Sequence, residues 1–271
     1  MKITFIGGGN MATALIGGLK KQGFSAAGMQ VVDPLEETRT RLTDDFGVRC
    51  TPAIDAAALN CEALVLAVKP QLMKQAVAAA AGRLGDQLVI SVAAGLQLKD
   101  IARWLGGHDQ IVRAMPNTPA LVQAGIAGMY AAPDLGHEAR SQAESVLRAV
   151  GGVVWVEAES LLDAVTAVSG SGPAYVFYFI ESLEAAAIAQ GLAADTARQL
   201  ALQTFLGAAK LALESGEEPA VLRQRVTSKG GTTERGIAAL EAAGVRQAID
   251  QAVAAASRRC AELGDELGRL A

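Results

Sequence analysis

The chain of 271 residues has 24 basic and 28 acidic residues, a net charge of −4 and no concentrated block of Lys and Arg, which argues against nucleic acid as a partner. With 51% hydrophobic residues, it is long and apolar enough to bury a large core. Its two histidines and three cysteines form no metal-ligand pattern, so we predict no metal site. No secretory signal and no charge-free run of about twenty apolar residues is present, so we expect a cytoplasmic protein without a membrane span.

Short apolar runs alternate with helical periodicity over the first 156 residues. We predict strands at residues 2–6, 29–32, 63–68, 88–92, 111–114, 124–131 and 151–156. We predict helices at residues 10–21, 35–45, 71–80, 98–105 and 138–150. Because strands that alternate with helices form a mostly parallel sheet covered on both faces, this half is predicted to be an α/β domain.

The pattern changes near residue 157, after which no convincing period-two alternation remains. Helices are predicted at residues 160–168, 174–190, 193–214 and 242–267. We therefore predict two domains: a Rossmann-like dinucleotide-binding domain over residues 1–157 and an all-helical domain over residues 158–271. The long Ala- and Leu-rich helices are too apolar to face water on every side, which favours a subunit interface over an ordinary helical core.

A glycine-rich turn follows the first predicted strand, where Gly7-Gly8-Gly9-Asn10-Met11-Ala12 fits the pattern G-x-G-x-x-A. In that pattern Gly7 makes the tight turn, Gly9 lets the backbone approach a pyrophosphate, and Ala12 lets the helix pack closely on the sheet. The N–H groups at the start of the helix attract the phosphates. A simple glycine turn is the alternative, but the position between a strand and a helix predicts a site for NAD(H) or NADP(H).

An acidic residue ends the second predicted strand. Asp33 stands where an acid accepts hydrogen bonds from the adenosine ribose of NAD and repels the extra phosphate of NADP. Arg39 and Arg41 lie downstream and partly compensate that charge. Asp33 also precedes Pro34, so a helix cap is an alternative role that can coexist with the first. The sequence therefore leaves the choice between NADH and NADPH open.

Two further segments follow predicted parallel strands at their C-terminal ends, where ligands of this fold bind. They are Ala67–Pro70 and Ala114–Pro119. Two prolines stiffen the second segment around Asn117, so we predict that its polar side chains orient the nicotinamide ring. A plain surface turn is the alternative.

In the helical half, residues 226–234 read Val-Thr-Ser-Lys-Gly-Gly-Thr-Thr-Glu. Gly230 and Gly231 permit a bend with exposed N–H groups, and such a nest before a helix binds a small anion such as a carboxylate. The two threonines that follow add hydroxyl donors. A helix N-cap that uses Thr and Glu234 is the alternative. We interpret the glycine- and serine-rich junction at residues 168–175 as a structural kink rather than a catalytic element.

Five motifs, in this order, carry a resemblance to a known family. They are GGGNMA, AVKP, MPNTPA, AVSGSGPAYVF and VTSKGGTTERGIAALE, and the match covers essentially the whole chain. The set resembles pyrroline-5-carboxylate reductase. The resemblance implies reduction of the cyclic imine 1-pyrroline-5-carboxylate to L-proline by NADPH or NADH, the last step of proline synthesis. It also implies a Rossmann domain followed by a helical dimerisation domain, in a homodimer that often belongs to a larger ring.

The resemblance also implies site residues by matching position. The substrate carboxylate would be held by the amides and hydroxyls of Ser228, Gly230, Gly231, Thr232 and Thr233. Thr233 is the candidate catalytic residue, since its hydroxyl would point toward the ring nitrogen. The cofactor would lie among Gly7, Gly9, Asn10, Met11, Asp33, Lys69, Pro70, Met115, Pro116 and Asn117. In the family, the carboxylate loop of one subunit meets a cofactor domain across the dimer interface.

Two positions depart from the family pattern. Many members have proline where this chain has Lys229, a side chain that either adds attraction for an anion or points to solvent. Several members have a polar, phosphate-friendly turn after the second strand, where this chain has Asp33-Pro34. A strict preference for NADP is therefore not implied.

Two other functions are compatible with a dinucleotide-binding fold, because the fold alone names no substrate. An enzyme like the β-hydroxyacid dehydrogenases needs a catalytic lysine in the helical half, where the sequence has only Lys210 and Lys229. A cofactor-sensing regulator would lack the polar loop near residue 230. Imine reduction needs positioning more than acid–base residues, which fits the absence of a His, Lys or Cys catalytic dyad.

Overall fold

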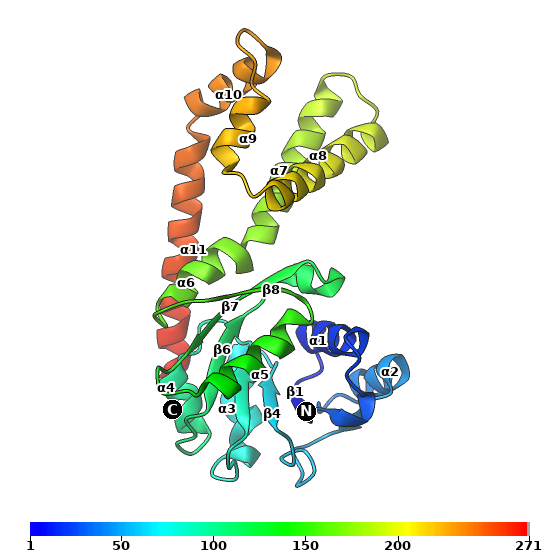
Figure 1. Cartoon of the computed structure of the whole chain (residues 1–271), viewed down its shortest axis with the longest axis vertical. Helices are drawn as coiled ribbons and strands as arrows, with labels where there is room; N and C mark the ends of the chain where they lie inside the picture. The colour runs from blue at the N-terminus through cyan, green and yellow to red at the C-terminus, as the bar shows by residue number, and fades with distance from the viewer. Residues whose placement is uncertain (270–271) are drawn as a thin grey trace. The chain divides into compact units, whose positions relative to one another are not determined.

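The computed structural model describes residues 1–269, and its α/β part is built on an eight-stranded sheet (Figure 1). The strands are β1 Ile3–Ile6, β2 Met29–Val32, β3 Arg49–Thr51, β4 Ala63–Leu66, β5 Leu88–Ser91, β6 Ile111–Met115, β7 Gly125–Ala131 and β8 Gly151–Trp155. Their spatial order is β3-β2-β1-β4-β5-β6-β7-β8, and only the β6–β7 pair is antiparallel among the described strands. The order reverses between β1 and β4, which is the point where open α/β sheets bind ligands.

Helices pack on the sheet and form two buried clusters with it. The helices of this part are α1 Asn10–Lys21, α2 Glu36–Phe46, α3 Met73–Val77, α4 Leu98–Trp104, α5 His137–Arg148 and α6 Leu161–Val165. One cluster contains Leu15 of α1 and Val146 of α5, and the other contains Met73 of α3 and Ile101 of α4. The sheet is therefore covered by helices on both faces, as the sequence predicts.

The strands supply both clusters because successive side chains of a strand point to opposite faces. Phe5 and Val65 join the cluster of α1 and α5, whereas Ile6 and Leu66 join the cluster of α3 and α4. Every residue of β1, β4 and β5 is buried. Strands buried on both faces read as continuous apolar runs, which is why the sequence predicts them closely.

The structure adds some elements that the sequence analysis did not predict. The short strand β3 lies at the edge of the sheet beside β2. The predicted helix at residues 160–168 is the short helix α6 followed by a π-helical turn, Thr166–Gly170. This turn falls in the serine- and glycine-rich junction, where the sequence predicts a kink. π-Helical turns are rare and are often found at functional sites.

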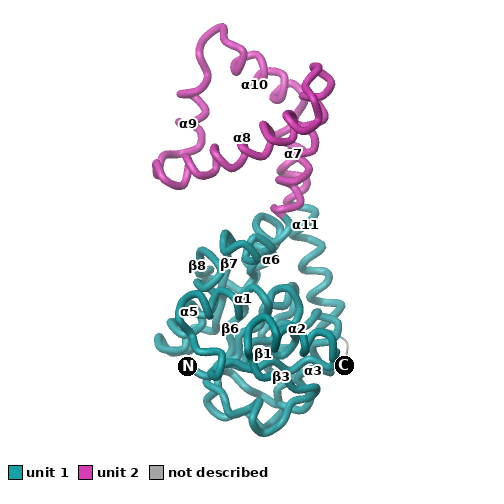
Figure 2. The backbone as a smooth tube through the Cα atoms, turned by 90° about the vertical axis from the view of Figure 1, so that its right-hand side faces the viewer, with its two compact units in different colours: residues 1–171, 254–271 teal, residues 172–253 magenta. Residues whose placement is uncertain are grey.

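Residues 172–253 form a second compact unit (Figure 2). It contains α7 Gly172–Ala189, α8 Ala194–Ser215, α9 Pro219–Arg225, α10 Thr232–Ala242 and the first part of α11 Val245–Gly268. Helices α7 and α8 pack together, and Arg198 of α8 forms a 3.1 Å ion pair with Glu184 of α7. In the described part of the chain, no helix is long and apolar enough to cross a membrane.

The compact units divide the chain differently from the predicted domains. Residues 1–171 and 254–269 belong to the first unit, so the compact division does not fall at residue 157. Helix α6 packs on β7, and Leu267 near the end of α11 lies in the cluster of α3 and α4. These buried contacts hold both helices to the sheet, although the change from strands to helices does occur after β8.

The helices of the second unit expose large apolar side chains. Phe177 is 59% exposed, Tyr178 is 68% exposed and Leu213 is 84% exposed. Helix α7 contains no buried residue. Exposed apolar surface of this extent is typical of a face that another protein surface covers. The chain on its own therefore does not bury these helices as an ordinary helical core would.

Candidate functional site

The turn after β1 has the geometry that the glycine motif predicts. Gly7 has a φ of +96°, and its N–H donates to the carbonyl oxygen of Val32 at 2.8 Å. An added Cβ at Gly7 would lie 2.7 Å from the carbonyl oxygen of Ala67, so this turn packs tightly against the end of β4. Gly9 precedes α1, and no atom lies within 4 Å of an ideal Cβ at this position.

The start of α1 is an open position for an anion. The first backbone bond of the helix runs from the N–H of Thr13 to the carbonyl oxygen of Gly9. The N–H groups of Asn10, Met11 and Ala12 therefore have no acceptor among the described residues. Free N–H groups and the positive end of the helix dipole together favour a phosphate there.

The carboxylate of Asp33 is fixed beside the glycine turn. One of its oxygens accepts the N–H of Gly8 at 2.8 Å, and the other accepts the N–H of Leu35 at 2.9 Å. The residue is only 8% exposed. Asp33 thus holds the backbone that leads into α2 and also places a negative charge at the end of β2, so the two predicted roles are compatible.

Two arginines of α2 flank this carboxylate. Arg39 donates to the carbonyl oxygens of Asp33 and Pro34, at 2.9 and 2.7 Å. Arg41 donates to the carbonyl oxygen of Gly8 at 3.2 Å. Both side chains bring positive charge close to Asp33, but each is engaged by backbone oxygens in this conformation.

The segments after β4 and β6 also lie at the carboxyl edge of the sheet. Lys69 is exposed and precedes a short 3-10 turn that begins at Pro70. Met115 is half-buried at the end of β6, and Pro116 is buried. Because β1, β2, β4 and β6 run in the same direction, the structure brings the glycine turn, Asp33 and these two segments to one edge of the sheet.

Asn117 lies in the loop after β6, as predicted, and its side-chain amide is hydrogen-bonded within the protein. Its Nδ2 donates to the carbonyl oxygen of Ser169 at 3.0 Å, and its Oδ1 accepts the N–H of Ile126 at 3.0 Å. The residue is 9% exposed. Both polar ends of the side chain therefore bind backbone groups of this protein, which sequence reasoning missed.

The predicted anion-binding loop lies in the second unit, just before α10. Gly230 has a φ of +73°, as the predicted bend requires. Its N–H, however, donates to Glu234 at 2.7 Å, and the N–H of Gly231 donates to the carbonyl oxygen of Ser228 at 3.0 Å. The prediction that these two glycine amides are free is therefore wrong for this conformation, because the loop satisfies them itself.

The unpaired N–H groups of this region lie in the first turn of α10, directly after the two glycines. The N–H groups of Thr232, Thr233 and Glu234 have no acceptor among the described residues, since the first bond of α10 comes from Arg235. Thr233 is half-buried and Thr232 is exposed. The start of α10 thus offers amide and hydroxyl donors to a small anion. Lys229 is exposed, as one of its two predicted roles requires.

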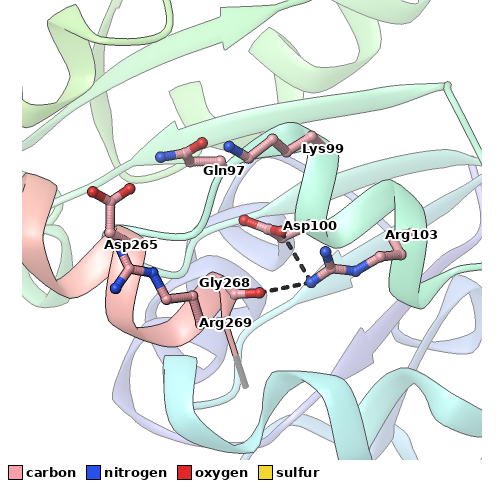
Figure 3. Close-up of a pocket in the computed structure, with 8 residues that line it drawn as sticks. Gln97, Lys99, Asp100, Arg103, Asp265, Gly268 and Arg269 are labelled. Carbon is pink, nitrogen blue, oxygen red and sulfur yellow. Dashed lines mark hydrogen bonds and ion pairs between the residues drawn. The ribbon is translucent and has the colours of Figure 1, made fainter. Parts of the chain in front are cut away.

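A pocket of about 330 Å³ lies between α4 and the end of α11, but it contains none of the predicted site residues (Figure 3). Arg103 donates to the carbonyl oxygen of Gly268 at 2.7 Å and pairs with Asp100 at 3.1 Å. The Arg103 guanidinium in this pocket is therefore bound by groups of the protein itself.

The three cysteines also lie outside the predicted site. Burial raises the pKa of the Cys61 and Cys260 thiols, which disfavours the reactive thiolate. Among the described residues, no group of His, Cys, Asp and Glu side chains is arranged to hold a metal ion.

Two family models match the chain. Residues 2–95 match a model described as NADP oxidoreductase, coenzyme F420-dependent. Residues 159–263 match a model described as pyrroline-5-carboxylate reductase dimerisation. The chain thus combines an NADP-binding Rossmann-like domain with a helical dimerisation domain, as the sequence predicts.

Curated relatives and solved structures match over nearly the full length. Pyrroline-5-carboxylate reductase of Pseudomonas aeruginosa is 45% identical over 269 residues, which cover 99% of this chain and 98% of that protein. The corresponding protein of Haemophilus influenzae is 42% identical and covers 96% of this chain and 97% of its own.

Two solved structures extend this similarity to the fold. A pyrroline-5-carboxylate reductase structure from Coxiella burnetii has a TM-score of 0.92 at 42% identity and covers 97% of this chain and 98% of its own. A pyrroline carboxylate reductase from Plasmodium falciparum, solved with NADP bound, has a TM-score of 0.85 at 28% identity, with the same coverage. The chain belongs to the pyrroline-5-carboxylate reductase family and is an NAD(P)H-dependent oxidoreductase that reduces 1-pyrroline-5-carboxylate to L-proline in proline biosynthesis.

Proposed function

We propose that the cofactor lies along the carboxyl edge of the sheet, with its pyrophosphate at the start of α1. The open space at Gly9 and the three free N–H groups of residues 10–12 support this placement, because they offer both room and donors. Around this point the proposal assigns cofactor contacts to Gly7, Gly9, Asn10, Met11, Asp33, Lys69, Pro70, Met115 and Pro116. The assignment extends the family resemblance to individual residues of this chain.

The cofactor supplies the hydride when it is bound. The protein's own contribution at that end of the site is to hold the nicotinamide in place, which we assign to Met115 and Pro116. Pro116 is buried and has a fixed φ, so the loop after β6 keeps one conformation. A rigid loop of this kind lowers the barrier by orientation rather than by proton transfer.

We infer that the enzyme accepts NADH as well as NADPH. The Asp33 carboxylate accepts two backbone N–H groups, which fix its position at the end of β2. A fixed negative charge at this place binds ribose hydroxyls and repels a 2′-phosphate. The guanidinium groups of Arg39 and Arg41 lie close to this carboxylate and reduce that repulsion, which supports acceptance of NADPH beside NADH.

For the substrate, we propose that its carboxylate binds at the start of α10. The free amides of residues 232–234 and the hydroxyls of Thr232 and Thr233 are the donors that support this proposal. Ser228 and the two glycines shape the turn and hold the amides in place. The hydroxyl of Thr233 is assigned to the ring nitrogen of the imine, where it orients the substrate and relays a proton from water.

We propose that the protein works as a homodimer, or as a ring of dimers, with the apolar faces of α7 and α8 at the interface. The exposed aromatic and leucine side chains of these helices support this assignment. The family resemblance further suggests that the loop before α10 of one subunit serves the cofactor domain of its partner. This would make the active site depend on two chains.

Subunit complementation tests that arrangement. We expect Gly9→Val to abolish cofactor binding, and Thr233→Ala to keep about 1–10% of the wild-type activity at low substrate concentration. In a mixed population that has exchanged subunits freely, half of the dimers combine both chains, and one of the two sites in each then has no altered residue. The expected activity is about one quarter of wild type. The measurement is NADPH consumption with 1-pyrroline-5-carboxylate.

A matched control uses Gly9→Val mixed with the double variant Gly9→Val/Thr233→Ala. Every site in that mixture carries an altered Gly9, so it should stay inactive whatever the arrangement. If the first mixture gives no more activity than the sum of its two parents, each loop serves its own chain and the proposed arrangement is wrong.

We propose a cytoplasmic protein with no nucleic-acid partner. We also propose that the functional division between cofactor domain and helical domain falls near residue 157, since the dimerisation model begins at residue 159.

A further inference from the structure

The loop after β6 is hydrogen-bonded to the π-helical turn Thr166–Gly170, which lies far along the chain. Asn117 connects the two, because its Nδ2 donates to the carbonyl oxygen of Ser169 at 3.0 Å. Its Oδ1 accepts the N–H of Ile126 in β7, also at 3.0 Å. One buried amide therefore ties the loop to β7 on one side and to the π-helical turn Thr166–Gly170 on the other.

The carbonyl oxygen of Ser169 is available for a reason that the sequence contains. In a continuous α-helix it would accept the N–H of the residue four positions later, and that residue is Pro173, which has no N–H. The π-helical turn already pairs the carbonyl oxygen of Thr166 with the N–H of Ser171 at 2.8 Å. The Asn117 amide thus supplies a donor in place of the N–H that Pro173 lacks.

A second contact joins the same two segments. Gly170, the last residue of the π-helical turn, lies against the side chain of Met115. An added Cβ at Gly170 would lie 2.6 Å from the Cε of Met115. The turn therefore contacts this region twice: Gly170 packs against Met115 at the end of β6, and Ser169 accepts a hydrogen bond from Asn117 in the loop that follows.

We propose that Asn117 and the π-helical turn Thr166–Gly170 position Met115 and Pro116, the residues assigned to the nicotinamide, and that Asn117 acts through these residues rather than by touching the cofactor. The inference rests on the proposed placement of the nicotinamide at Met115 and Pro116. Both polar ends of the Asn117 side chain form hydrogen bonds to backbone groups. These bonds fix the position of the loop and therefore of Met115 and Pro116, which precede Asn117. An error of about 1 Å in such a loop costs up to about 100-fold in rate.

Asn117→Asp tests the hydrogen bond to Ser169. The aspartate keeps the oxygen that accepts the N–H of Ile126, but it replaces the donor with a carboxylate oxygen that faces the Ser169 carbonyl. We expect kcat to fall at least about 10-fold, while KM for NADPH changes less than about threefold, because the adenosine and pyrophosphate contacts are untouched.

Two further readouts separate positioning from a loss of folded protein. With NADPH deuterated at C4, the kinetic isotope effect should rise, since hydride transfer becomes slower than the other steps. With the label placed on one face of C4 at a time, the variant should show partial transfer from the wrong face. A variant that is merely less stable retains the isotope effect and the stereospecificity of wild type.

Gly170→Ala tests the packing contact between the π-helical turn and Met115. The atom that a Cβ at Gly170 meets is the end of the flexible Met115 side chain, which can move, and alanine favours a helical conformation more than glycine, so this variant should fold. Its methyl group must displace the Met115 side chain, so it should show the same fall in kcat with little change in KM for NADPH. Gly172→Ala is the matched control, because nothing lies within 4 Å of a Cβ at that position, and its kinetics should equal those of wild type.

Met115→Ala distinguishes failure of the inference from failure of the placement on which it rests. If Met115→Ala has normal kcat and stereospecificity, the nicotinamide does not lie there, and both proposals are wrong. If Met115→Ala is impaired but Asn117→Asp and Gly170→Ala match wild type in kcat, isotope effect and stereospecificity, the positioning role alone is overturned. Should Asn117→Asp fail to fold, Gly170→Ala decides.

Discussion

Replacing Thr233 by alanine is expected to lower kcat/KM for 1-pyrroline-5-carboxylate by about 10- to 100-fold. Thr233 is half-buried in the first turn of α10, beside amides that have no other acceptor among the described residues. Removal of a hydroxyl that hydrogen-bonds a charged substrate costs about 1.5–3 kcal/mol, which corresponds to this range. The measurement is steady-state kinetics with saturating NADPH.

The controls separate the hydroxyl from the rest of the side chain. Thr233→Ser keeps the hydroxyl and loses only a methyl group, so its kcat/KM should stay within about threefold of wild type. The Kd for NADPH should not change in either variant, because the cofactor contacts lie elsewhere in the sequence. Turnover at the wild-type level in Thr233→Ala would show that the assigned role is wrong.

Substitution of Gly9 is expected to weaken NADPH binding without loss of stability, whereas substitution of Gly7 is expected to lower the stability of the fold. Gly9 has an ordinary extended backbone, with φ −71° and ψ −171°, and has open space around its Cβ position. Gly9→Ala should therefore fold like wild type but raise the Kd for NADPH at least about 10-fold, because the methyl group occupies the place of the pyrophosphate.

Gly7→Ala should instead destabilise the fold. An alanine there must adopt a φ of +96° and place its Cβ 2.7 Å from the carbonyl oxygen of Ala67. Backbone strain and overpacking of this kind each cost about 1–3 kcal/mol. Urea unfolding without cofactor and fluorescence titration with NADPH measure the two effects. A Gly9→Ala protein that binds NADPH as tightly as wild type would contradict the placement of the pyrophosphate.

The local features of this chain could be predicted because each depends on neighbouring residues. The glycine turn is specified by a strand, three glycines and a helix within about twenty positions. The central strands are evident as apolar runs because both of their faces are buried. In contrast, β3 has only three residues, none of them fully buried, so it leaves no apolar run to detect.

The features that sequence reasoning missed depend on contacts between distant residues. The direction of β7 relative to β6 is not encoded in the pattern of either strand. The return of α11 to the first unit depends on burial of Leu267 against residues far earlier in the chain. The loop near residue 230 illustrates a third limit, since the bend was predicted but the acceptors that its glycine amides find were not.

For Asn117, the sequence indicated the loop in which it lies but not the partners of its side chain. Its place in a proline-bounded loop at the end of a strand marked it as a site residue. Its partners, however, are the backbone groups of Ser169 and Ile126, and nothing near Asn117 in the sequence indicates them. The signal that was available is Pro173, because a proline four residues after Ser169 predicts one carbonyl oxygen without a helical donor.

The most direct test of this account is a steady-state assay of the purified protein with 1-pyrroline-5-carboxylate, in which the loss of nicotinamide absorbance is compared with the L-proline formed. We expect one proline for each NAD(P)H consumed, values of kcat/KM for NADH and NADPH within about 10-fold of each other, and no oxidation or reduction of cofactor with hydroxyacids. A more than about 100-fold advantage of NADPH would contradict the role given to Asp33. Cofactor turnover with hydroxyacids but none with the cyclic imine would contradict the account as a whole.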